Sequence, residues 1–333
     1  MKPERATAPG IRALVLALAG ALLLSACTTV RVPTAHGRAR ECWIDLARGE
    51  EADHADVIAD LARADVVYVG EAHTIRRHHE LQLRLLQELF ALGRPLTLCL
   101  EQLEARDQPA VDRYARGEIG FAALAAEIEW EKKWRNYRDY EALCEFARAH
   151  HLPIRALNAP AAVIRAVSRG GGLAKLPVGD RAQLPAEVHL DDPAYERLMQ
   201  LELAVHMAVD PAKLRPMFEA QASRDETMAA NLVAALRPTD APKRVALVVV
   251  GAGHVRYGFG TAERVRRRLP EVTERIVLIT ESGELTLSAA DKAASREVTI
   301  SHEDLRALGR PPGDYVRVLP KITLPPGHPP VAR

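Results

Sequence analysis

The sequence predicts an α/β fold: a mainly parallel sheet flanked by helices, with a helical insert or lid. Two observations predict it. Short apolar runs alternate with helical patterns along the chain, which is typical of a parallel sheet covered by helices. Two of these runs also end in related four-residue patterns, Gly70-Glu71-Ala72-His73 and Gly251-Ala252-Gly253-His254, so each is read as a buried strand that delivers a histidine.

The expected elements follow in chain order. We expect strands at the apolar runs 65–69, 96–100, 153–157, 245–250, 275–279 and 314–319. We expect helices at 76–92, 106–116, 138–149, 195–209, 212–236 and 261–268, where apolar residues recur every three or four positions. Glycines and prolines interrupt this alternation between 168 and 193, which predicts a surface excursion that introduces the helical lid.

Residues 1–26 are predicted to be a lipoprotein signal peptide. Basic residues precede the apolar stretch 13–24, which is too short to span a membrane comfortably as a mature helix, and Leu24-Ser25-Ala26-Cys27 follows. We expect Cys27 to carry acyl chains such as palmitate, with a plain secretory signal as the alternative. Thr28, by resemblance to lipoprotein sorting, favours the outer membrane, on its periplasmic or surface face. The predicted location is therefore the cell outer membrane, through a lipid anchor.

The mature chain is expected to contain one large domain. We place a tether at 27–54, an α/β domain at 55–320 and a Pro-rich tail at 321–333. Removing residues 1–26 takes away three basic residues and one acidic residue and leaves a net charge of −1, so nothing favours nucleic acid as a partner. The three remaining cysteines, an odd number, argue against a disulfide framework.

The two histidine patterns predict a shared site. In an open α/β sheet, ligands bind at the carboxyl ends of the strands, so His73 and His254 are expected to meet although 181 residues separate them. Glu71 and Glu101 close their strands and are expected at the same edge. These side chains, with Asp225, offer ligands for a divalent metal ion, or acid/base chemistry without a metal, in which a carboxylate orients a histidine that activates water.

Polar side chains interrupt two inward helical stripes near this edge. In the helix at 76–92 they are His78, His79 and Gln82, and in the helix at 212–236 they are Gln221 and Asp225. Polar groups on an inward face need partners or a wet pocket. They therefore either cap buried strand ends or bind a ligand.

Aromatic residues give a further signal. Trp130, Trp134, Tyr137 and Tyr140 recur at spacings of four, three and three, which predicts one helical face, and Tyr257 follows His254 between glycines. Flat side chains suit a flat ligand, and tyrosinate oxygen is a ligand of ferric haem iron. The alternative for Trp130 and Trp134 is ordinary packing in a lid helix.

Several motifs together resemble the ChaN family of haem-binding lipoproteins, in a superfamily with the Tiki proteases and erythromycin esterases. The resemblance covers roughly residues 55–262 and rests on Gly70-Glu71-Ala72-His73 with His78, His79 and Gln82; Leu100-Glu101-Gln102 with Gln108; Trp130, Trp134, Tyr137 and Tyr140; Asn158-Ala159-Pro160; Ala220-Gln221 with Arg224-Asp225 and Met228-Ala229; and Gly253-His254 with Tyr257-Gly258-Phe259-Gly260. One departure is Thr261-Ala262, where many relatives have Val-Pro.

The resemblance implies haem as cofactor, a role in haem or iron uptake, and haem held in a homodimer with a tyrosine on the iron. Tyr257 is the first candidate for this ligand, and Tyr137 and Tyr140 follow. We expect the residues around the haem to be Tyr257, His254, His73, His78, Gln82, Gln221, Asp225, Tyr137 and Tyr140, with Arg224 or Arg256 paired to propionates. The superfamily's enzymes keep a second hypothesis open, an envelope hydrolase that uses Glu71, His73 and His254, with or without a metal ion.

Overall fold

The computed structural model describes residues 34–35, 38–39, 41–206, 211–237, 244–282 and 309–320. The predicted signal peptide, the predicted acylation site Cys27 and the Pro-rich tail lie outside these residues. Among the helices of the described part, none has the length and apolar character needed to cross a membrane.

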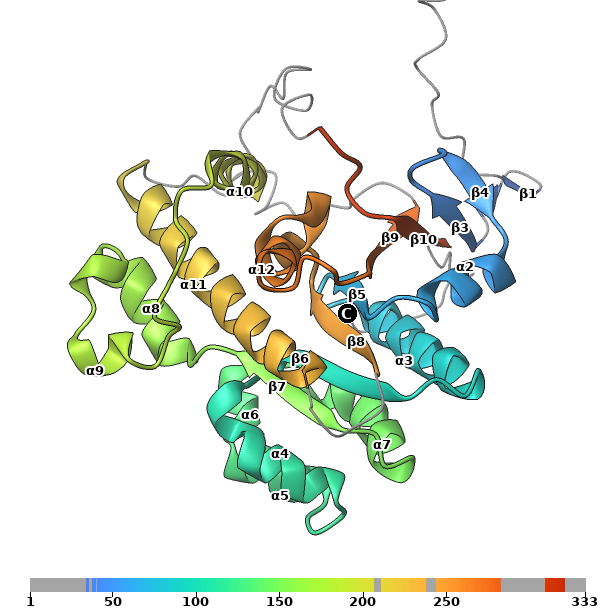
Figure 1. The fold of residues 1–333 in the computed structure, drawn as a ribbon, viewed down its shortest axis with the longest axis horizontal. Helices are drawn as coiled ribbons and strands as arrows, with labels where there is room; N and C mark the ends of the chain where they lie inside the picture. The colour runs from blue at the N-terminus through green and yellow to red at the C-terminus, as the bar shows by residue number, and fades with distance from the viewer. Residues whose placement is uncertain are drawn as a thin grey trace, which may run out of the picture.

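An eight-stranded sheet forms the centre of the molecule (Figure 1). Its strands lie in the order β4-β3-β10-β9-β5-β8-β6-β7. The six from β10 to β7 are parallel to one another, and β3 and β4 extend the sheet antiparallel at one edge. The strands are β3 (Cys42–Asp45), β4 (Glu50–Ala52), β5 (Val66–Glu71), β6 (Leu96–Glu104), β7 (Ile154–Asn158), β8 (Val245–Gly251), β9 (Glu274–Ser282) and β10 (Tyr315–Pro320).

Alternate residues of the central strands face two separate cores, because successive side chains of a strand point to opposite faces. Val67 and Val69 of β5 pack in one cluster with Leu85, while Val66 and Tyr68 pack in the other with Met228. Strands β5 and β8 are buried along their whole length. Buried parallel strands read as continuous apolar runs, which explains why the sequence predicted them.

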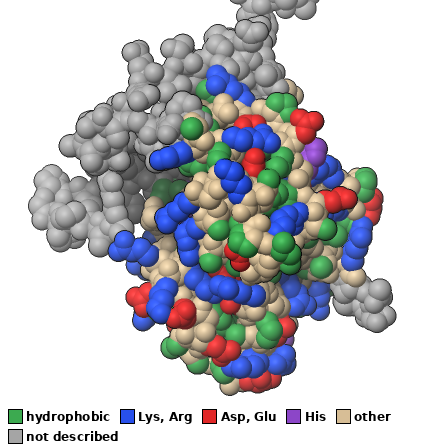
Figure 2. All heavy atoms as spheres, turned by 90° about the vertical axis from the view of Figure 1, so that its left-hand side faces the viewer, with side chains coloured by type: hydrophobic (Ala, Val, Ile, Leu, Met, Phe, Trp, Pro, Cys, Tyr) green, Lys and Arg blue, Asp and Glu red, His purple; other side chains and the backbone are tan. Residues whose placement is uncertain are grey.

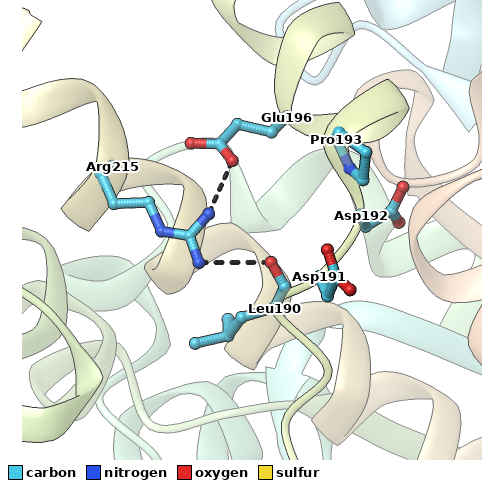
Figure 3. A pocket seen from close by; sticks show the side chains of 6 residues that line it. All are labelled: Leu190, Asp191, Asp192, Pro193, Glu196 and Arg215. Atoms are coloured by element: carbon cyan, nitrogen blue, oxygen red, sulfur yellow. Dashed lines mark hydrogen bonds and ion pairs between the residues drawn. The ribbon is translucent and has the colours of Figure 1, made fainter.

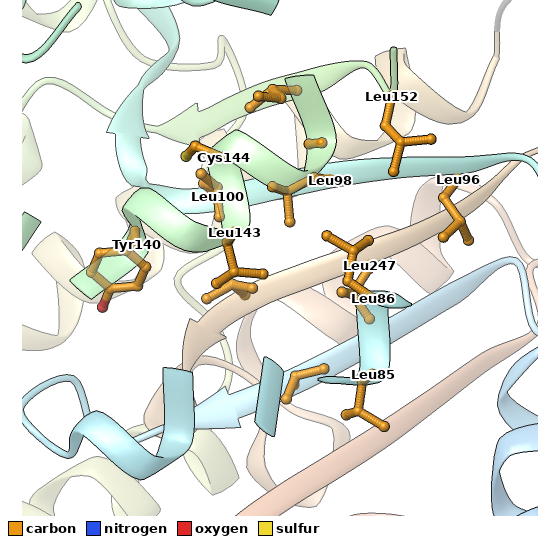
Figure 4. Packing of buried hydrophobic residues seen from close by; sticks show 14 of the residues in the cluster. Leu85, Leu86, Leu96, Leu98, Leu100, Tyr140, Leu143, Cys144, Leu152 and Leu247 are labelled. Atoms are coloured by element: carbon orange, nitrogen blue, oxygen red, sulfur yellow. The ribbon is translucent and has the colours of Figure 1, made fainter. Parts of the chain in front are cut away.

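One helical layer covers the face of Val67. It contains α2 (His54–Leu61), α3 (Arg76–Ala91), α4 (Gln108–Ala115), α5 (Phe121–Glu127), α6 (Trp130–Lys133) and α7 (Glu141–Ala149), with 3-10 turns η1 (Ala105–Asp107) and η2 (Tyr137–Tyr140). Figure 4 shows leucines of α3, β6 and β8 meeting Leu143 and Cys144 of α7 in this core.

The other layer is built on the long helix α11 (Pro211–Leu236), which packs against α8 (Ala161–Gly170) and α12 (Gly260–Arg268). The chain between α8 and α11 forms η3 (Leu173–Lys175), α9 (Val178–Arg181) and α10 (Pro193–His206) (Figure 1). The first two lie in the predicted excursion at 168–193, and α10 is the helix that this excursion was predicted to introduce. The face seen in Figure 2 carries basic and acidic side chains intermixed. A separate pair of short strands, β1 (Thr34–Ala35) and β2 (Arg38–Ala39), precedes the sheet.

The fold class is confirmed, and each of the six predicted strands is present as β5, β6, β7, β8, β9 and β10. The predicted helices correspond to α3, α4, α7, α10, α11 and α12, with 3-10 turns opening the regions of α4 and α7. Helices α2, α5, α8 and α9 were not predicted, and α6 lies where the aromatic spacing predicted a longer helix.

The tether boundary at 54 is wrong. Strands β3 and β4 belong to the main sheet, where β3 pairs with β10. Trp43 is buried in the core, and its indole N–H donates to His54 Nδ1 at 2.9 Å. The domain therefore begins before residue 55, because a short antiparallel pair completes the edge of the sheet.

The predicted aromatic helix is also wrong. Glu129 is left-handed (φ 51°), α6 ends after one turn, and Trp134 is extended before η2 begins. The four aromatic residues therefore do not share one helical face. Trp130 is buried, and its indole N–H donates to the carbonyl of Gln102 at 2.8 Å, so it packs as core.

Candidate functional site

Three neighbouring strands bring the predicted site residues together. Glu71 ends β5 opposite Gly251, which ends β8. Glu101 follows Leu100, the last residue of β6 that pairs with β8, but it does not close its strand as predicted, because β6 continues past an irregularity to Glu104. The backbone N–H of Gly251 donates to Glu101 Oε2 at 2.6 Å, which joins β8 to the β6 carboxylate. This is the carboxyl edge of the parallel sheet, where the sequence predicted the site.

Glu101 lies between the two motif histidines. His254 Nε2 is 3.3 Å from Glu101 Oε1. On the other side, a β-carbon built on Gly251 would lie 2.8 Å from His73 Nε2 and 3.4 Å from Glu101 Oε2. His73 therefore lies over the space left by the missing Gly251 side chain, next to Glu101. The predicted meeting of His73 and His254 is observed.

Buried donors surround Glu71. Its Oε1 atom accepts from His73 Nδ1 at 2.8 Å, Gln102 Nε2 at 3.0 Å and the Tyr140 hydroxyl at 2.5 Å. Gln82 Nε2 donates to Oε2 at 2.5 Å, and His79 Nδ1 lies 3.1 Å from the same oxygen. Burial alone would raise the pKa of Glu71, but these hydrogen bonds, led by His73 and His79, lower it to about 2. Glu71 is therefore an ionised carboxylate that orients His73.

His73 is the solvent-accessible member of this group, with 36% of its side chain exposed. Its ring meets Trp134 edge to face, with ring centroids 4.9 Å apart. Burial lowers the pKa of His73, and the hydrogen bond to Glu71 together with the charge of Glu101 more than reverses this, so that the net shift is upward. His73 thus combines a fixed orientation, an accessible face and a raised proton affinity.

His254 is held between two carboxylates. Its Nδ1 atom is 2.7 Å from Asp225 Oδ1, and its Nε2 atom faces Glu101. Burial opposes the charge of the ring, but Glu101 and Asp225 raise the pKa of His254 to about 9. At neutral pH His254 is therefore an imidazolium with both nitrogens engaged. It neutralises buried carboxylates and has no nitrogen free for a ligand.

Several residues that were predicted to contact a ligand are buried, and they support the site through hydrogen bonds inside the protein. His78 and Gln82 are buried in α3, and Asp225 is buried in α11. His78 Nδ1 accepts from the backbone N–H of Ala72 at 3.0 Å, and burial lowers the pKa of His78 to about 4, so it is neutral. These side chains hydrogen-bond within the protein and position His73 and His254, which was the simpler interpretation of the sequence.

The candidate tyrosines differ in accessibility. The buried Tyr140 donates its hydroxyl to Glu71, so this hydroxyl is not open to an iron. Tyr137 is half-buried and stacks on Phe121. Tyr257 is half-buried, has left-handed backbone (φ 56°), and packs beside Tyr195 and Phe259. The backbone N–H of Tyr257 donates to the carbonyl of Pro312 at 2.8 Å, and its hydroxyl makes no hydrogen bond to the residues that the structure describes.

Tyr195 is a site residue that the sequence analysis missed. Its buried hydroxyl donates to Asp225 Oδ2 at 2.8 Å and lies 3.2 Å from the carbonyl of Gly253. Tyr195 belongs to α10, so the predicted lid touches the second motif directly. Thr261 departs from the family pattern. Its hydroxyl donates to Asp225 Oδ1 at 2.9 Å. No local pattern marks Tyr195, because its partners are distant in the sequence.

A pocket of about 290 Å³ lies at the start of α10, apart from the two histidines. Figure 3 shows Arg215 spanning it, with hydrogen bonds to Glu196 at 2.6 Å and to the carbonyl of Leu190 at 3.2 Å. Arg215 also pairs with Glu219 on its own helix. Arg215 therefore crosses the pocket with its positive charge already paired with Glu196 and Glu219. In the part of the chain that the structure describes, no three His, Cys, Asp or Glu side chains are grouped to hold a metal ion.

The fold and the site together define an α/β protein with two histidine–carboxylate groups at the carboxyl edge of a parallel sheet. The family model described as haem-binding uptake, Tiki superfamily, ChaN matches residues 57–265. The chain belongs to this family, as its motifs predicted.

Comparison with solved structures shows the same fold in one of them, and two others have lower similarity. The structure described as cofacial heme binding to ChaN of Campylobacter jejuni is 18% identical, with a TM-score of 0.61, and the match covers 83% of this chain and 96% of that one. An erythromycin esterase is 11% identical, with a TM-score of 0.41 and coverage of 75% and 81%. A Bacillus cereus protein is 10% identical, with a TM-score of 0.43 and coverage of 81% and 92%. No curated protein matches the sequence.

Proposed function

We propose that this chain binds haem non-covalently at the carboxyl edge of β5, β8 and β6, with Tyr257 as the iron ligand, and that it supports haem or iron uptake in the cell envelope. The observation that carries the proposal is family membership over residues 57–265 combined with a half-buried Tyr257 whose hydroxyl makes no hydrogen bond to the described residues. The structural neighbour from Campylobacter jejuni is described as binding haem cofacially, which supports the same ligand.

The donor set fits a haem. When bound, haem supplies a ferric iron for which a tyrosinate oxygen is a competent ligand. The Tyr257 hydroxyl makes no hydrogen bond within the described residues, and its ring lies in an aromatic cluster with Tyr195 and Phe259 that suits a flat macrocycle. Gln221 and His73 are also partly exposed at this edge. We assign ligation to Tyr257 and the wall of the site to His73 and Gln221.

We further propose that the mature protein is anchored to the outer membrane through acylated Cys27, and that two copies enclose haem as a homodimer. The sequence Leu24-Ser25-Ala26-Cys27 supports the anchor, because acyl chains at this cysteine give stable attachment. Mass spectrometry of the protein purified from membranes tests it: an acylated Cys27 is expected at the new amino terminus, and an unmodified Cys27 would contradict the anchor. Size-exclusion chromatography with light scattering, with and without haemin, tests the dimer.

Titration with haemin tests the ligand. The wild type is expected to give a saturable Soret shift that Tyr257→Phe weakens strongly. Tyr137→Phe is the matched control, because Tyr137 is also half-buried but packs on Phe121 in the other layer. Absence of a saturable shift in the wild type, or an equal response of the two variants, would remove the proposal.

An envelope hydrolase is the second candidate, and one observation favours it. Glu71 orients a half-exposed His73 whose pKa is raised, which is the arrangement of a histidine that activates water or protonates a leaving group. In this mechanism Glu71 and His73 act directly, and His254 supports them by holding Glu101. The test is turnover of ester and peptide substrates by the wild type and by His73→Ala, with metal analysis of both. Activity that His73→Ala abolishes would establish it, and an inactive wild type would count against it.

A further inference from the structure

The backbone of Tyr257 is held in a conformation that a tyrosine rarely adopts. Tyr257 lies in η5 (Arg256–Gly258) with φ 56° and ψ 20°, the left-handed region in which a side chain crowds its own backbone. Such a residue persists only where the surrounding structure fixes it. Gly258 and Gly260 are left-handed as well, so the loop 257–260 turns sharply. The contacts that hold this loop therefore determine where the Tyr257 ring lies.

The segment 310–314 supplies three such contacts from a distant part of the chain. The carbonyl of Pro312 accepts the backbone N–H of Tyr257 at 2.8 Å. The guanidinium of Arg310 lies over the ring of Phe259, 5.0 Å from its centroid. A β-carbon built on Gly258 would lie 3.0 Å from Arg310 Nη1, so the same side chain also approaches Gly258 closely. The segment thus contacts three successive residues of the loop.

This segment is itself fixed to the sheet, directly before β10. The backbone N–H of Asp314 donates to the carbonyl of Ile276 in β9 at 2.8 Å, and Asp314 Oδ2 accepts from the N–H of Ile276 at 2.7 Å. A β-carbon on Gly313 would lie 2.9 Å from the Ile276 carbonyl oxygen, so the two backbones pass too closely for a side chain. Two prolines at 311–312 restrict the chain further. The carbonyl that holds the loop therefore stands on a rigid support.

The other contacts of the loop come from within the family match. Phe259 stacks on Tyr195 of α10, with ring centroids 5.9 Å apart, and Arg266 of α12 donates to the carbonyl of Gly258. Both partners lie inside residues 57–265, whereas the segment 310–314 lies outside them. The family match therefore does not account for the contacts that this segment makes with the loop.

We propose that the segment 310–314 is a clamp that positions Tyr257. The Pro312 carbonyl fixes the left-handed backbone, and Arg310 covers the neighbouring residues of the loop. That the positioned hydroxyl ligates haem iron rests on the proposed function. Arg310 and Pro312 are positioning residues, because they act through Tyr257. Without the clamp, the Tyr257 backbone relaxes to an ordinary conformation, and ordering it again opposes ligand binding.

Hydrogen exchange at the Tyr257 amide, resolved by residue in the haem-free full chain, tests the clamp without any ligand. Gly313→Ala is expected to displace Pro312, because the added β-carbon overlaps the Ile276 carbonyl, and to speed this exchange roughly tenfold. Gly179→Ala is the matched control, because no described atom lies within 4 Å of its β-carbon. It should leave the exchange at Tyr257 unchanged.

Haemin titration and resonance Raman spectroscopy test what the clamp does for binding. We expect Gly313→Ala to lower the affinity about fivefold and to weaken the iron–phenolate vibration. Arg310 is exposed, so Arg310→Gln should fold normally and lower the affinity about two- to fivefold, and Arg310→Lys should restore most of it. Arg138→Gln removes the same kind of contact from the Tyr137 ring, at 5.5 Å, and should bind haemin as the wild type does.

Each outcome decides one step. Faster exchange at Tyr257 and weaker haemin binding in both clamp variants, with rescue by Arg310→Lys, support the clamp. If Gly313→Ala does not fold, Arg310→Gln decides by the same measurements. A Tyr257 amide that exchanges freely in the wild type, or equally slowly in the clamp variants, overturns the clamp.

Two further results separate the clamp from the proposed function. If Tyr257→Phe weakens haemin binding while the clamp variants bind normally, the positioning role is overturned. If the clamp variants speed exchange at Tyr257 while Tyr257→Phe binds haemin as the wild type does, the clamp stands and the proposed iron ligand fails.

Discussion

The imidazole of His73 occupies the space that a side chain at Gly251 would need. A β-carbon there would lie 2.8 Å from both Cε1 and Nε2 of His73, closer than real β-carbons approach other atoms. The backbone of Gly251 (φ −59°, ψ 135°) is open to any residue, so the glycine is needed for space and not for conformation. The second glycine-histidine motif thus makes room for the histidine of the first.

Gly251→Ala is expected to displace His73 from Glu101. Overpacking of this kind costs about 1–3 kcal/mol of unfolding free energy, and haemin binding should weaken as well. Urea denaturation and Soret titration measure the two effects. Gly253→Ala is the matched control, because among the described residues its β-carbon would meet only Glu202 Oε2, at 3.7 Å, an ordinary contact. Equal effects of the two substitutions would contradict the proposed steric role.

The pKa of His254 predicts a loss of stability in mild alkali. The folded pKa is about 9, above the ordinary histidine value of 6.5, so the stability contributed by the imidazolium is complete below pH 6.5 and is lost as pH rises through 9. One proton changes the unfolding free energy by at most about 1.4 kcal/mol per pH unit. Unfolding between pH 6.5 and 9.5 should therefore show a shallower pH dependence in His254→Gln than in the wild type. Parallel curves for the two proteins would contradict the charged state of His254.

Tyr195→Phe is expected to destabilise the protein by about 1–3 kcal/mol, because Asp225 Oδ2 is buried and loses the hydroxyl that donates to it. Chemical unfolding measures the loss. Tyr114→Phe is the comparison: the Tyr114 hydroxyl donates to Glu145, whose side chain is 36% exposed and can turn to water instead. If Tyr195→Phe lowered the unfolding free energy less than Tyr114→Phe, Asp225 would not depend on the hydrogen bond that α10 provides.

Gln108 is expected to protect the open edge of the sheet. Its side chain accepts from the N–H of Ala156 at 2.8 Å and donates to the carbonyl of Ile154 at 2.9 Å, so it pairs with β7 as a neighbouring strand would. Gln108→Glu keeps the size but loses the donor to Ile154. We expect a lower Tm and more aggregation on heating, measured by scattering, than in Gln183→Glu on the exposed surface. Equal aggregation of the two variants would contradict the proposal that Gln108 protects this edge of the sheet.

The sequence predicted the site correctly where polar site residues stand at the ends of apolar strands. Apolar runs that end in Glu71 and Gly251 are buried parallel strands, and adjacent parallel strands must end at the same edge, so the meeting of His73 and His254 followed. Contacts made by lone residues were not predictable. Tyr195 reaches Asp225 from another helix without a local pattern, and the left-handed Glu129 breaks the aromatic repeat without a glycine or proline to signal it.

The short edge strands were missed for a related reason. Strand β4 begins with two glutamates and is mostly exposed, and β3 is four residues long, so neither forms an apolar run. Their place in the sheet depends on Trp43 and on pairing with β10, which comes some 270 residues later in the chain. Pairing over such a distance leaves no local trace in the sequence.

Resonance Raman spectroscopy of the haemin-loaded protein tests the central claim most directly, because it detects the bond between the iron and a tyrosinate oxygen. We expect an iron–phenolate vibration in the wild type and in Tyr137→Phe, and its absence in Tyr257→Phe. A wild-type spectrum without this vibration, or one that persists in Tyr257→Phe, would contradict haem binding through Tyr257 at this edge of the sheet.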